Sequence, residues 1–331
     1  MLREMVKEII IHVIQYYLIL TFVLTVVSVL RMYRIRFRAG AAKYGKARKT
    51  QLAEEHRLRQ FPIYTVEEVK SRKSRGAVRV TFFPADGVER GKVAIVCPGG
   101  GYDHLVEKYE GYPIAAKLNE MGINAFVLEY RVGRHCSYHA PMHDLAQTVS
   151  YITEHQDEFN VDMEGYAIVG FSAGGNMAGI FGSEEYGYEH YGVARPGALL
   201  MGYPWTNVNH WFEHPYWNIW VGLMGVWLSE RGNFWMFRLH HFNRENRDSI
   251  CVQKWITKKF PPVYMFAGGN DILVPSGAHT DVLEKALKEY EVPYKYEKFF
   301  GVPHGVGLGV HTKADHWLET AVEFWQEQIS K

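Results

Sequence analysis

Residues 166–176 read YAIVGFSAGGN, in which an apolar run leads into a serine flanked by glycines and then into small residues. The run 167–169 is typical of a buried strand, and the small residues after Ser172 are typical of a helix start. A sharp turn from strand to helix needs glycine on both sides of its central residue, because the backbone is strained and its neighbours are crowded. The G-x-S-x-G pattern therefore predicts a nucleophilic serine held above a sheet. The alternative is a glycine turn that only permits close packing of helix on strand.

A second glycine-rich segment lies upstream, where an apolar run leads into PGGGY at residues 98–102. A loop without side chains lets backbone N–H groups approach a substrate oxygen. We therefore expect N–H groups of this loop to form an oxyanion hole together with the N–H of Ala173, the residue after the nucleophile. Tyr102, at the end of the loop, is expected to contact substrate. A phosphate-binding loop is excluded because the lysine of G-x-x-x-x-G-K-[ST] is absent, and G-x-G-x-x-G does not fit either.

An acid and a histidine follow the serine in the order that a triad on such a turn requires. Asp271 lies in the turn AGGNDILVP after the apolar run 263–266, at a strand's carboxyl end, where open α/β sheets keep their sites. His304 lies in the glycine-flanked loop GVPHG after the run 294–299. Taken singly, Asp271 is also typical of a turn or helix cap, and His304 of a surface loop. Together they predict Ser172 as nucleophile, His304 as general base and then acid, and Asp271 as the carboxylate that orients the histidine.

The rest of the chain alternates between strand-like and helix-like segments. Apolar strand-like runs occur at residues 77–83, 93–97, 125–128, 167–169, 198–201, 263–266 and 294–299. Between them apolar residues recur every three or four positions, as in 141–159, which is typical of an amphipathic helix. The alternation predicts an α/β fold, with a mainly parallel sheet and helices on both faces.

Residues 205–250 interrupt this alternation and carry six of the nine tryptophans of the chain. We expect this stretch to be an insertion that forms either ordinary core or a cap over the serine. If it forms a cap, Trp217 and Trp220 are the residues expected to bind substrate.

The N-terminal segment is apolar over Ile9–Leu30, 22 residues without a formal charge. A helix of this length reaches across the ~30 Å hydrocarbon core of a bilayer. Residues 31–49 then carry eight basic and no acidic side chains, which by the positive-inside rule places the rest of the chain in the cytosol. A cleaved signal peptide would have a shorter apolar region and a small-residue cleavage site. The alternative to a membrane span is a buried amphipathic helix, which His12 and Gln15 favour.

The sequence therefore predicts a membrane anchor with a basic juxtamembrane segment at 1–50, a linker at 51–75 and a catalytic domain at 76–331. The formal charge of +1 combines ten basic and two acidic residues in the first part with 27 basic and 34 acidic residues in the remainder. Because the basic charge is local, a nucleic-acid partner is not expected. The three cysteines are scattered and form no C-x-x-C pair, so neither a disulfide framework nor a thiolate metal site is predicted.

Six motifs, taken as a set, resemble those of a known superfamily. They read PGGGY, EYR, GFSAGGN, GYP, GGNDxxVP and PHGxGL, and the resemblance covers about residues 75–328. The set resembles the α/β-hydrolase superfamily, and within it the serine esterase and lipase branch that includes acetylxylan-esterase-like and feruloyl-esterase-like enzymes. The resemblance implies an α/β-hydrolase fold and hydrolysis of short acyl esters, often on carbohydrate, with no metal or organic cofactor. It also implies that Gly100 and Gly101 are positions of the oxyanion loop.

Two other functions fit the same fold. A serine peptidase of the prolyl-oligopeptidase type shares the triad order, but such enzymes usually carry an N-terminal propeller that residues 1–76 cannot form. A non-catalytic ligand-binding protein would be expected to have lost a member of the triad, and none is missing here. We therefore expect a membrane-anchored serine esterase whose partner is a small-molecule ester of small or medium acyl length.

Overall fold

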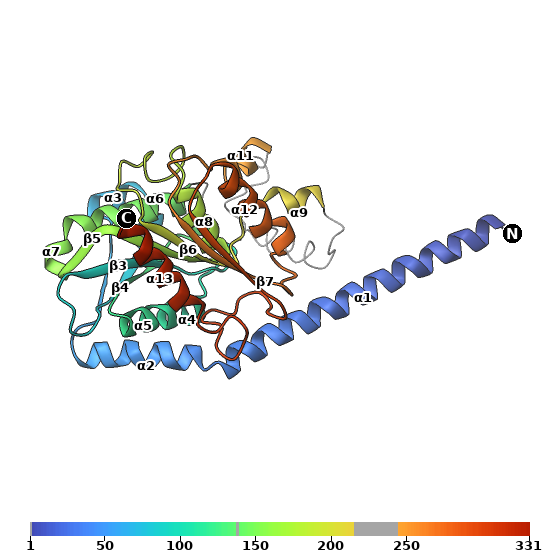
Figure 1. Ribbon diagram of the computed structural model, residues 1–331. Helices are drawn as coiled ribbons and strands as arrows, with labels where there is room; N and C mark the ends of the chain where they lie inside the picture. The colour runs from blue at the N-terminus through green and yellow to red at the C-terminus, as the bar shows by residue number, and fades with distance from the viewer. Residues whose placement is uncertain (1, 137–138, 215–243) are drawn as a thin grey trace.

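The computed structural model describes residues 2–136, 139–214 and 244–331 (Figure 1). Its described strands form one eight-stranded sheet in the order β1-β2-β4-β3-β5-β6-β7-β8. Their bounds are β1 (Arg59–Phe61), β2 (Arg79–Phe83), β3 (Gly91–Cys97), β4 (Asn124–Glu129), β5 (Val161–Phe171), β6 (Ala198–Gly202), β7 (Val263–Gly268) and β8 (Tyr294–Phe299). Strands β1 and β2 run antiparallel to their neighbours, and all pairs from β4 through β8 are parallel. The predicted mainly parallel sheet is confirmed.

Helices lie on both faces of this sheet. The α-helices are α1 (Leu2–Arg38), α2 (Ala41–Glu54), α3 (Val66–Ser71), α4 (Glu107–Glu110), α5 (Tyr112–Glu120), α6 (Ala140–Glu154), α7 (Gln156–Phe159), α8 (Ala173–Phe181), α9 (Asn209–Glu213), α11 (Arg244–Asp248), α12 (Thr280–Glu289) and α13 (Trp317–Ile329). Short 3-10 helices lie at Lys73–Ala77, Gly133–His135, Val252–Lys254 and Ser276–Ala278.

The two faces bury separate apolar cores, because successive side chains of a strand point to opposite sides. In β3, for example, Ile95 packs into the core beneath α6, α8 and α12, whereas Val96 packs into the core beneath α5 and α13. Central strands with helices on both sides are buried throughout, which is why they appear in the sequence as unbroken apolar runs.

The expected linker at 51–75 is part of the packed domain. Leu52, near the end of α2, is fully buried in the core beneath α5. Strand β1 then pairs with β2 as the edge of the sheet, and Phe61 stacks on the ring of Tyr151 at 5.2 Å. An edge strand of three residues has too few positions to produce a recognisable alternation, so the sequence did not reveal it.

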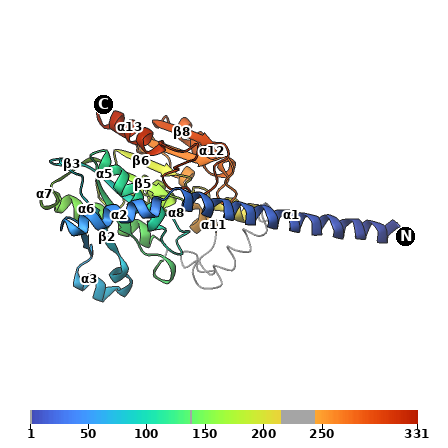
Figure 2. The same cartoon turned by 90° about the horizontal axis from the view of Figure 1, so that it is seen from below.

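Helix α1 is continuous over 37 residues and includes the whole apolar segment Ile9–Leu30. Its N-terminal part projects away from the domain in both views of the molecule, whereas its C-terminal end lies against the domain (Figures 1 and 2). Gly40, at φ 62°, separates it from α2, which packs on the domain. By length and composition alone this helical stretch could cross a membrane, and a signal sequence would meet the same criterion.

Candidate active site

Ser172 occupies the sharp turn between β5 and α8. Its backbone lies at φ 49° and ψ −116°, a region that residues with a side chain rarely adopt. A Cβ atom at Gly174 would collide with the carbonyl oxygen of Cys97, and one at Gly170 would collide with the backbone of Gly174. Glycine is therefore required on both sides of the serine, which is the physical reason for the G-x-S-x-G pattern.

The structure brings Ser172, His304 and Asp271 together in one hydrogen-bonded chain. Nε2 of His304 lies 3.0 Å from Oγ of Ser172, and Nδ1 of His304 lies 2.6 Å from Oδ2 of Asp271. The three residues follow β5, β8 and β7, whose carboxyl ends lie at the same edge of the parallel sheet. With Nδ1–H donating to the carboxylate, Nε2 is free to accept the serine proton.

The carboxylate of Asp271 is held by its own loop. Its Oδ1 accepts hydrogen bonds from the backbone N–H groups of Leu273 at 2.9 Å and Val274 at 2.8 Å. The side chain is fully buried, and that of His304 is 12% exposed. Charge-assisted hydrogen bonds of this kind fix the orientation of a carboxylate, so Oδ2 faces the histidine.

The glycine loop lies directly against the serine. A Cβ atom at Gly99 would come within 2.9 Å of Cβ of Ser172, so no larger residue fits there. Gly100, at φ 129°, and Gly101, at φ 65°, adopt conformations that glycine favours. Among the described residues, the N–H groups of Gly100, Gly101 and Ala173 donate to no protein acceptor. These three backbone donors are therefore left without a protein acceptor in the part of the chain that the structure describes.

A model of the α/β hydrolase fold family matches residues 112–308, more than half of the chain and a range that contains all three residues of the hydrogen-bonded chain. The chain belongs to the α/β-hydrolase family.

Curated relatives of this α/β hydrolase include esterases. It is 29% identical to an acetylxylan esterase of Xylanibacter ruminicola over 76% of the chain and 48% of that protein. It is 28% identical to the esterase LipC of Mycobacterium tuberculosis over 65% of the chain and 53% of that protein. The chain thus spans about half the length of the curated relatives that it matches.

Solved structures share the fold at lower sequence identity. An acetyl ester-xyloside bifunctional hydrolase from Caldicellulosiruptor lactoaceticus aligns at a TM-score of 0.67 and 21% identity, over 81% of this chain and 96% of the other. A carboxylesterase from Lactobacillus plantarum aligns at 0.60 and 21%, over 76% and 92%.

The predicted substrate contacts of this α/β hydrolase have different outcomes. Tyr102 is buried, and its hydroxyl donates to Oδ1 of Asn176 at 2.8 Å. The structure therefore shows Tyr102 linking the glycine loop to α8, while a contact with substrate stays a prediction. Trp217 and Trp220 lie outside the described residues, as does most of the predicted cap at 205–250.

Three residues that the sequence analysis did not single out connect the glycine loop at residues 98–102 with the loop that carries His304. Glu110 is buried, and its Oε2 accepts the N–H of Gly99 at 2.8 Å. Its Oε1 accepts from the hydroxyl of Tyr203 at 3.0 Å and from Nη2 of Arg36 at 3.3 Å. Tyr203 belongs to the GYP motif, whereas Glu110 and Arg36 belong to no motif and were not detectable from local patterns.

Tyr203 also contacts His304 and its loop directly. Its ring lies edge-to-face with that of His304, with centroids 4.8 Å apart, and its hydroxyl accepts the N–H of Gly307 at 2.9 Å. Burial, together with the charge of Glu110, raises the pKa of Tyr203 well above its usual value. The hydroxyl therefore stays protonated and donates to Glu110.

Proposed function

We propose that this protein is a serine carboxylic-ester hydrolase that works through an acyl-enzyme. The observation that carries the proposal is the hydrogen-bonded chain from Ser172 through His304 to Asp271, at 3.0 and 2.6 Å. These distances are those of a nucleophile, its general base and the group that orients the base.

In the first half of the reaction, Oγ of Ser172 attacks the ester carbonyl carbon while Nε2 of His304 takes the serine proton. Asp271 stabilises the imidazolium that forms. The carbonyl oxygen becomes an oxyanion, which the free N–H groups of Gly100, Gly101 and Ala173 are placed to bind. The N-terminal end of α8 adds a favourable dipole. Collapse of the intermediate breaks the ester bond, and His304 returns the proton to the departing alcohol.

In the second half, water attacks the acyl-serine and His304 takes the proton of that water. The second tetrahedral intermediate uses the same N–H groups. Its collapse releases the carboxylic acid and returns the proton to Oγ of Ser172. The net reaction consumes one ester and one water, and it gives one alcohol and one acid.

We infer that the substrates are esters of small or medium acyl groups, among them acetyl esters of carbohydrate. Support comes from the acetylxylan esterase among the curated relatives. The net negative charge of the chain after residue 50, with 27 basic and 34 acidic residues, disfavours strongly anionic substrates.

The test of this function is labelling with a fluorophosphonate followed by a panel of p-nitrophenyl esters from acetyl to palmitoyl, acetylated xylo-oligosaccharides and a proline-containing peptide. We expect covalent labelling of Ser172 and the highest kcat/KM among the shorter acyl esters. Cleavage of the peptide in preference to every ester would identify a peptidase instead. An absence of both labelling and hydrolysis would identify a binding protein on this fold.

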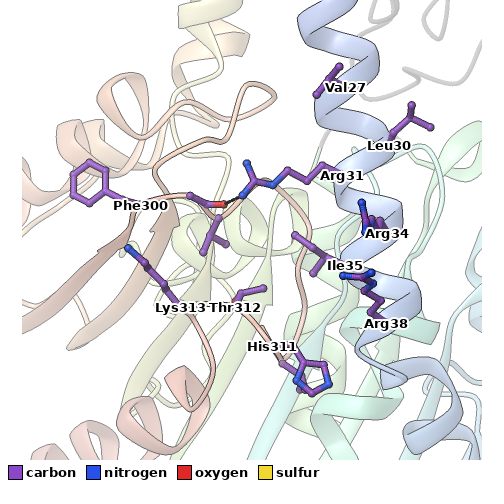
Figure 3. Close-up of a pocket in the computed structure, with 13 residues that line it drawn as sticks. Val27, Leu30, Arg31, Arg34, Ile35, Arg38, Phe300, His311, Thr312 and Lys313 are labelled. Carbon is purple, nitrogen blue, oxygen red and sulfur yellow. Dashed lines mark hydrogen bonds between the residues drawn. The ribbon is translucent and has the colours of Figure 1, made fainter.

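We further propose that α1 anchors the protein in a membrane through Ile9–Leu30, with the hydrolase domain in the cytosol. A groove of about 930 Å³ between α1 and the loops after β8 supports this placement (Figure 3). Arg31, Arg34 and Arg38 line it beside Val27 and Leu30, and no acidic side chain lines it among the described residues. Where a helix leaves the bilayer, apolar side chains contact the acyl chains and cationic side chains contact the anionic headgroups, so a groove that combines both kinds is expected at that boundary.

Membrane attachment predicts a definite fractionation. We expect the full chain to stay with membranes through high salt and carbonate and to be released by detergent, because the span is uncharged and about as long as a bilayer is thick. Replacing Leu20 and Leu24 by arginine should shift the protein to the soluble fraction, since arginine at a helix centre opposes insertion by ~2.5–3.5 kcal/mol. Release of the natural chain by carbonate alone would show peripheral attachment. Digestion of the hydrolase domain by protease added outside intact cells would reverse the orientation.

A further inference from the structure

We propose that Arg36 of α1 is a positioning residue for both catalytic loops, so that the N-terminal helix completes the active site as well as carrying the apolar segment. The inference rests on the esterase function proposed above. It concerns the geometry of the His304 loop and of the glycine loop, which Arg36 contacts at the same time.

The first contact of Arg36 is with the histidine loop. Its Nε donates to the carbonyl oxygen of Gly305, the residue directly after His304, at 2.6 Å. Gly305 has φ 73°, and a Cβ atom there would collide with the guanidinium group of Arg36. The close approach of guanidinium and backbone therefore depends on glycine at this position. Arg31 makes a similar contact from a position five residues earlier on α1, where its Nη2 donates to the carbonyl oxygen of Gly301 at 2.6 Å (Figure 3).

The second contact is with Glu110, the residue that holds the glycine loop. Nη2 of Arg36 lies 3.3 Å from Oε1 of Glu110, and the two side chains are 11% and 2% exposed. Oε2 of the same carboxylate accepts the N–H of Gly99, which adjoins the proposed oxyanion donors. One buried carboxylate thus joins the arginine of α1 to the loop beside Ser172.

Removing Arg36 would leave Glu110 buried without its cation. An uncompensated buried charge is strongly unfavourable, so the side chain or its surroundings must rearrange. Any shift of Glu110 moves the loop that begins at Gly99. The loss of the contact with Gly305 frees the histidine loop at the same time, although Tyr203 still holds Gly307. Catalysis is sensitive to such changes, because displacing reacting groups by about 1 Å can lower the rate ~10²-fold.

A purely structural role is disfavoured by where Arg36 lies. The two apolar cores of the domain are built from the sheet and the helices that follow α1, and of the described residues of α1 only Ile35 packs against one of them. Loss of one arginine from this helix removes little apolar packing. We therefore expect its effect to fall on turnover more than on the stability of the domain.

The test compares Arg36→Ala with Arg38→Ala in the full-length protein in detergent micelles. Arg38 lies on the same helix and carries the same charge, and it makes no hydrogen bond to either loop in the described residues. We expect Arg36→Ala to lower kcat for p-nitrophenyl acetate on the order of 10²-fold at a temperature where the variant is fully folded, with KM nearly unchanged and Tm lowered because Glu110 loses its cation. Fluorophosphonate labelling of Ser172 should slow in parallel. Arg38→Ala should match the natural protein in all four measurements.

Two further measurements separate positioning from general damage. Millimolar guanidinium ion should restore part of the activity of Arg36→Ala and none of that of Ser172→Ala, because only the first variant leaves a guanidinium-shaped space. Arg36→Ala combined with Glu110→Gln should lose less activity than the two single losses multiplied, since the residues act through one contact. If Arg36→Ala does not fold, Arg36→Lys is compared with the control instead. Its kcat should be lower than that of the natural protein, because one ammonium group cannot reproduce both contacts of the guanidinium.

The outcomes are distinguishable from failure of the proposed function. An active natural protein with Arg36→Ala indistinguishable from Arg38→Ala would overturn the inference and leave the esterase assignment intact. Loss of activity only at temperatures where Arg36→Ala unfolds, without guanidinium rescue, would also overturn it, because the role would then be structural. A natural protein that neither hydrolyses esters nor reacts with fluorophosphonate would overturn both.

Discussion

Replacing Ser172 by alanine is expected to lower kcat for ester hydrolysis by a factor of about 10⁴ or more while the protein stays folded. The hydroxyl supplies the atom that forms the acyl-enzyme, and its loss leaves only the binding site and the oxyanion donors to assist water. The substitution removes a single oxygen atom and its one hydrogen bond to His304, so little packing is lost. The measurements are kcat on p-nitrophenyl acetate and Tm by circular dichroism.

Ser71→Ala is the matched control, since Ser71 is exposed at the end of α3 and remote in sequence from the site. It should match the natural protein. Near-normal activity in a folded Ser172→Ala variant would remove the serine from the mechanism and with it the acyl-enzyme.

Replacing Asp271 by asparagine is expected to lower kcat/KM on the order of 10⁴-fold. An amide in this position is held by the same N–H groups of Leu273 and Val274, which donate to its oxygen. Its NH₂ group then faces Nδ1 of His304 and favours the tautomer with the proton on Nε2. That nitrogen can no longer accept the proton of Ser172, and the imidazolium loses its stabilising charge.

Asp281→Asn provides the control, because Asp281 lies on α12 and binds Lys298 and Tyr296 instead of a histidine. We expect fluorophosphonate to label Asp271→Asn slowly and Asp281→Asn at the rate of the natural protein. Nearly full activity in Asp271→Asn would show that another carboxylate orients His304.

The elements around the nucleophile were predictable because their constraints are local. The glycines beside Ser172 are required because a side chain there would collide with atoms a few residues away or on the next strand, and these glycines appear directly in the sequence. Asp271 and His304 each follow an apolar strand, and parallel strands collect their carboxyl ends at one edge. The same reasoning underestimated β5, which begins at Val161 instead of residue 167. In the first part of β5, apolar residues alternate with the polar residues Asp162 and Glu164. The unbroken apolar run therefore indicated only the fully buried second part of the strand.

The contacts of α1 were not predictable for the opposite reason. Arg36 lies 74 positions from Glu110 and 269 from Gly305, so no spacing or periodicity connects them. Within the sequence, Arg36 is one of eight basic residues after an apolar run, and the whole group favours a membrane-facing role. Only the placement of the helix against the loops after β8 distinguishes this arginine from its neighbours.

The positive φ of Ser172 bears on how this protein would respond to selection. Glycine adopts φ 49° with little strain, whereas serine holds it at a cost of order 1–3 kcal/mol. A library screened only for folded, abundant protein would therefore tend to enrich replacements that relax this turn and abolish chemistry. Directed evolution of a more stable variant should keep residues 170–174 fixed or should screen for esterase activity in every round. Screening for protein abundance alone would favour variants that have lost Ser172.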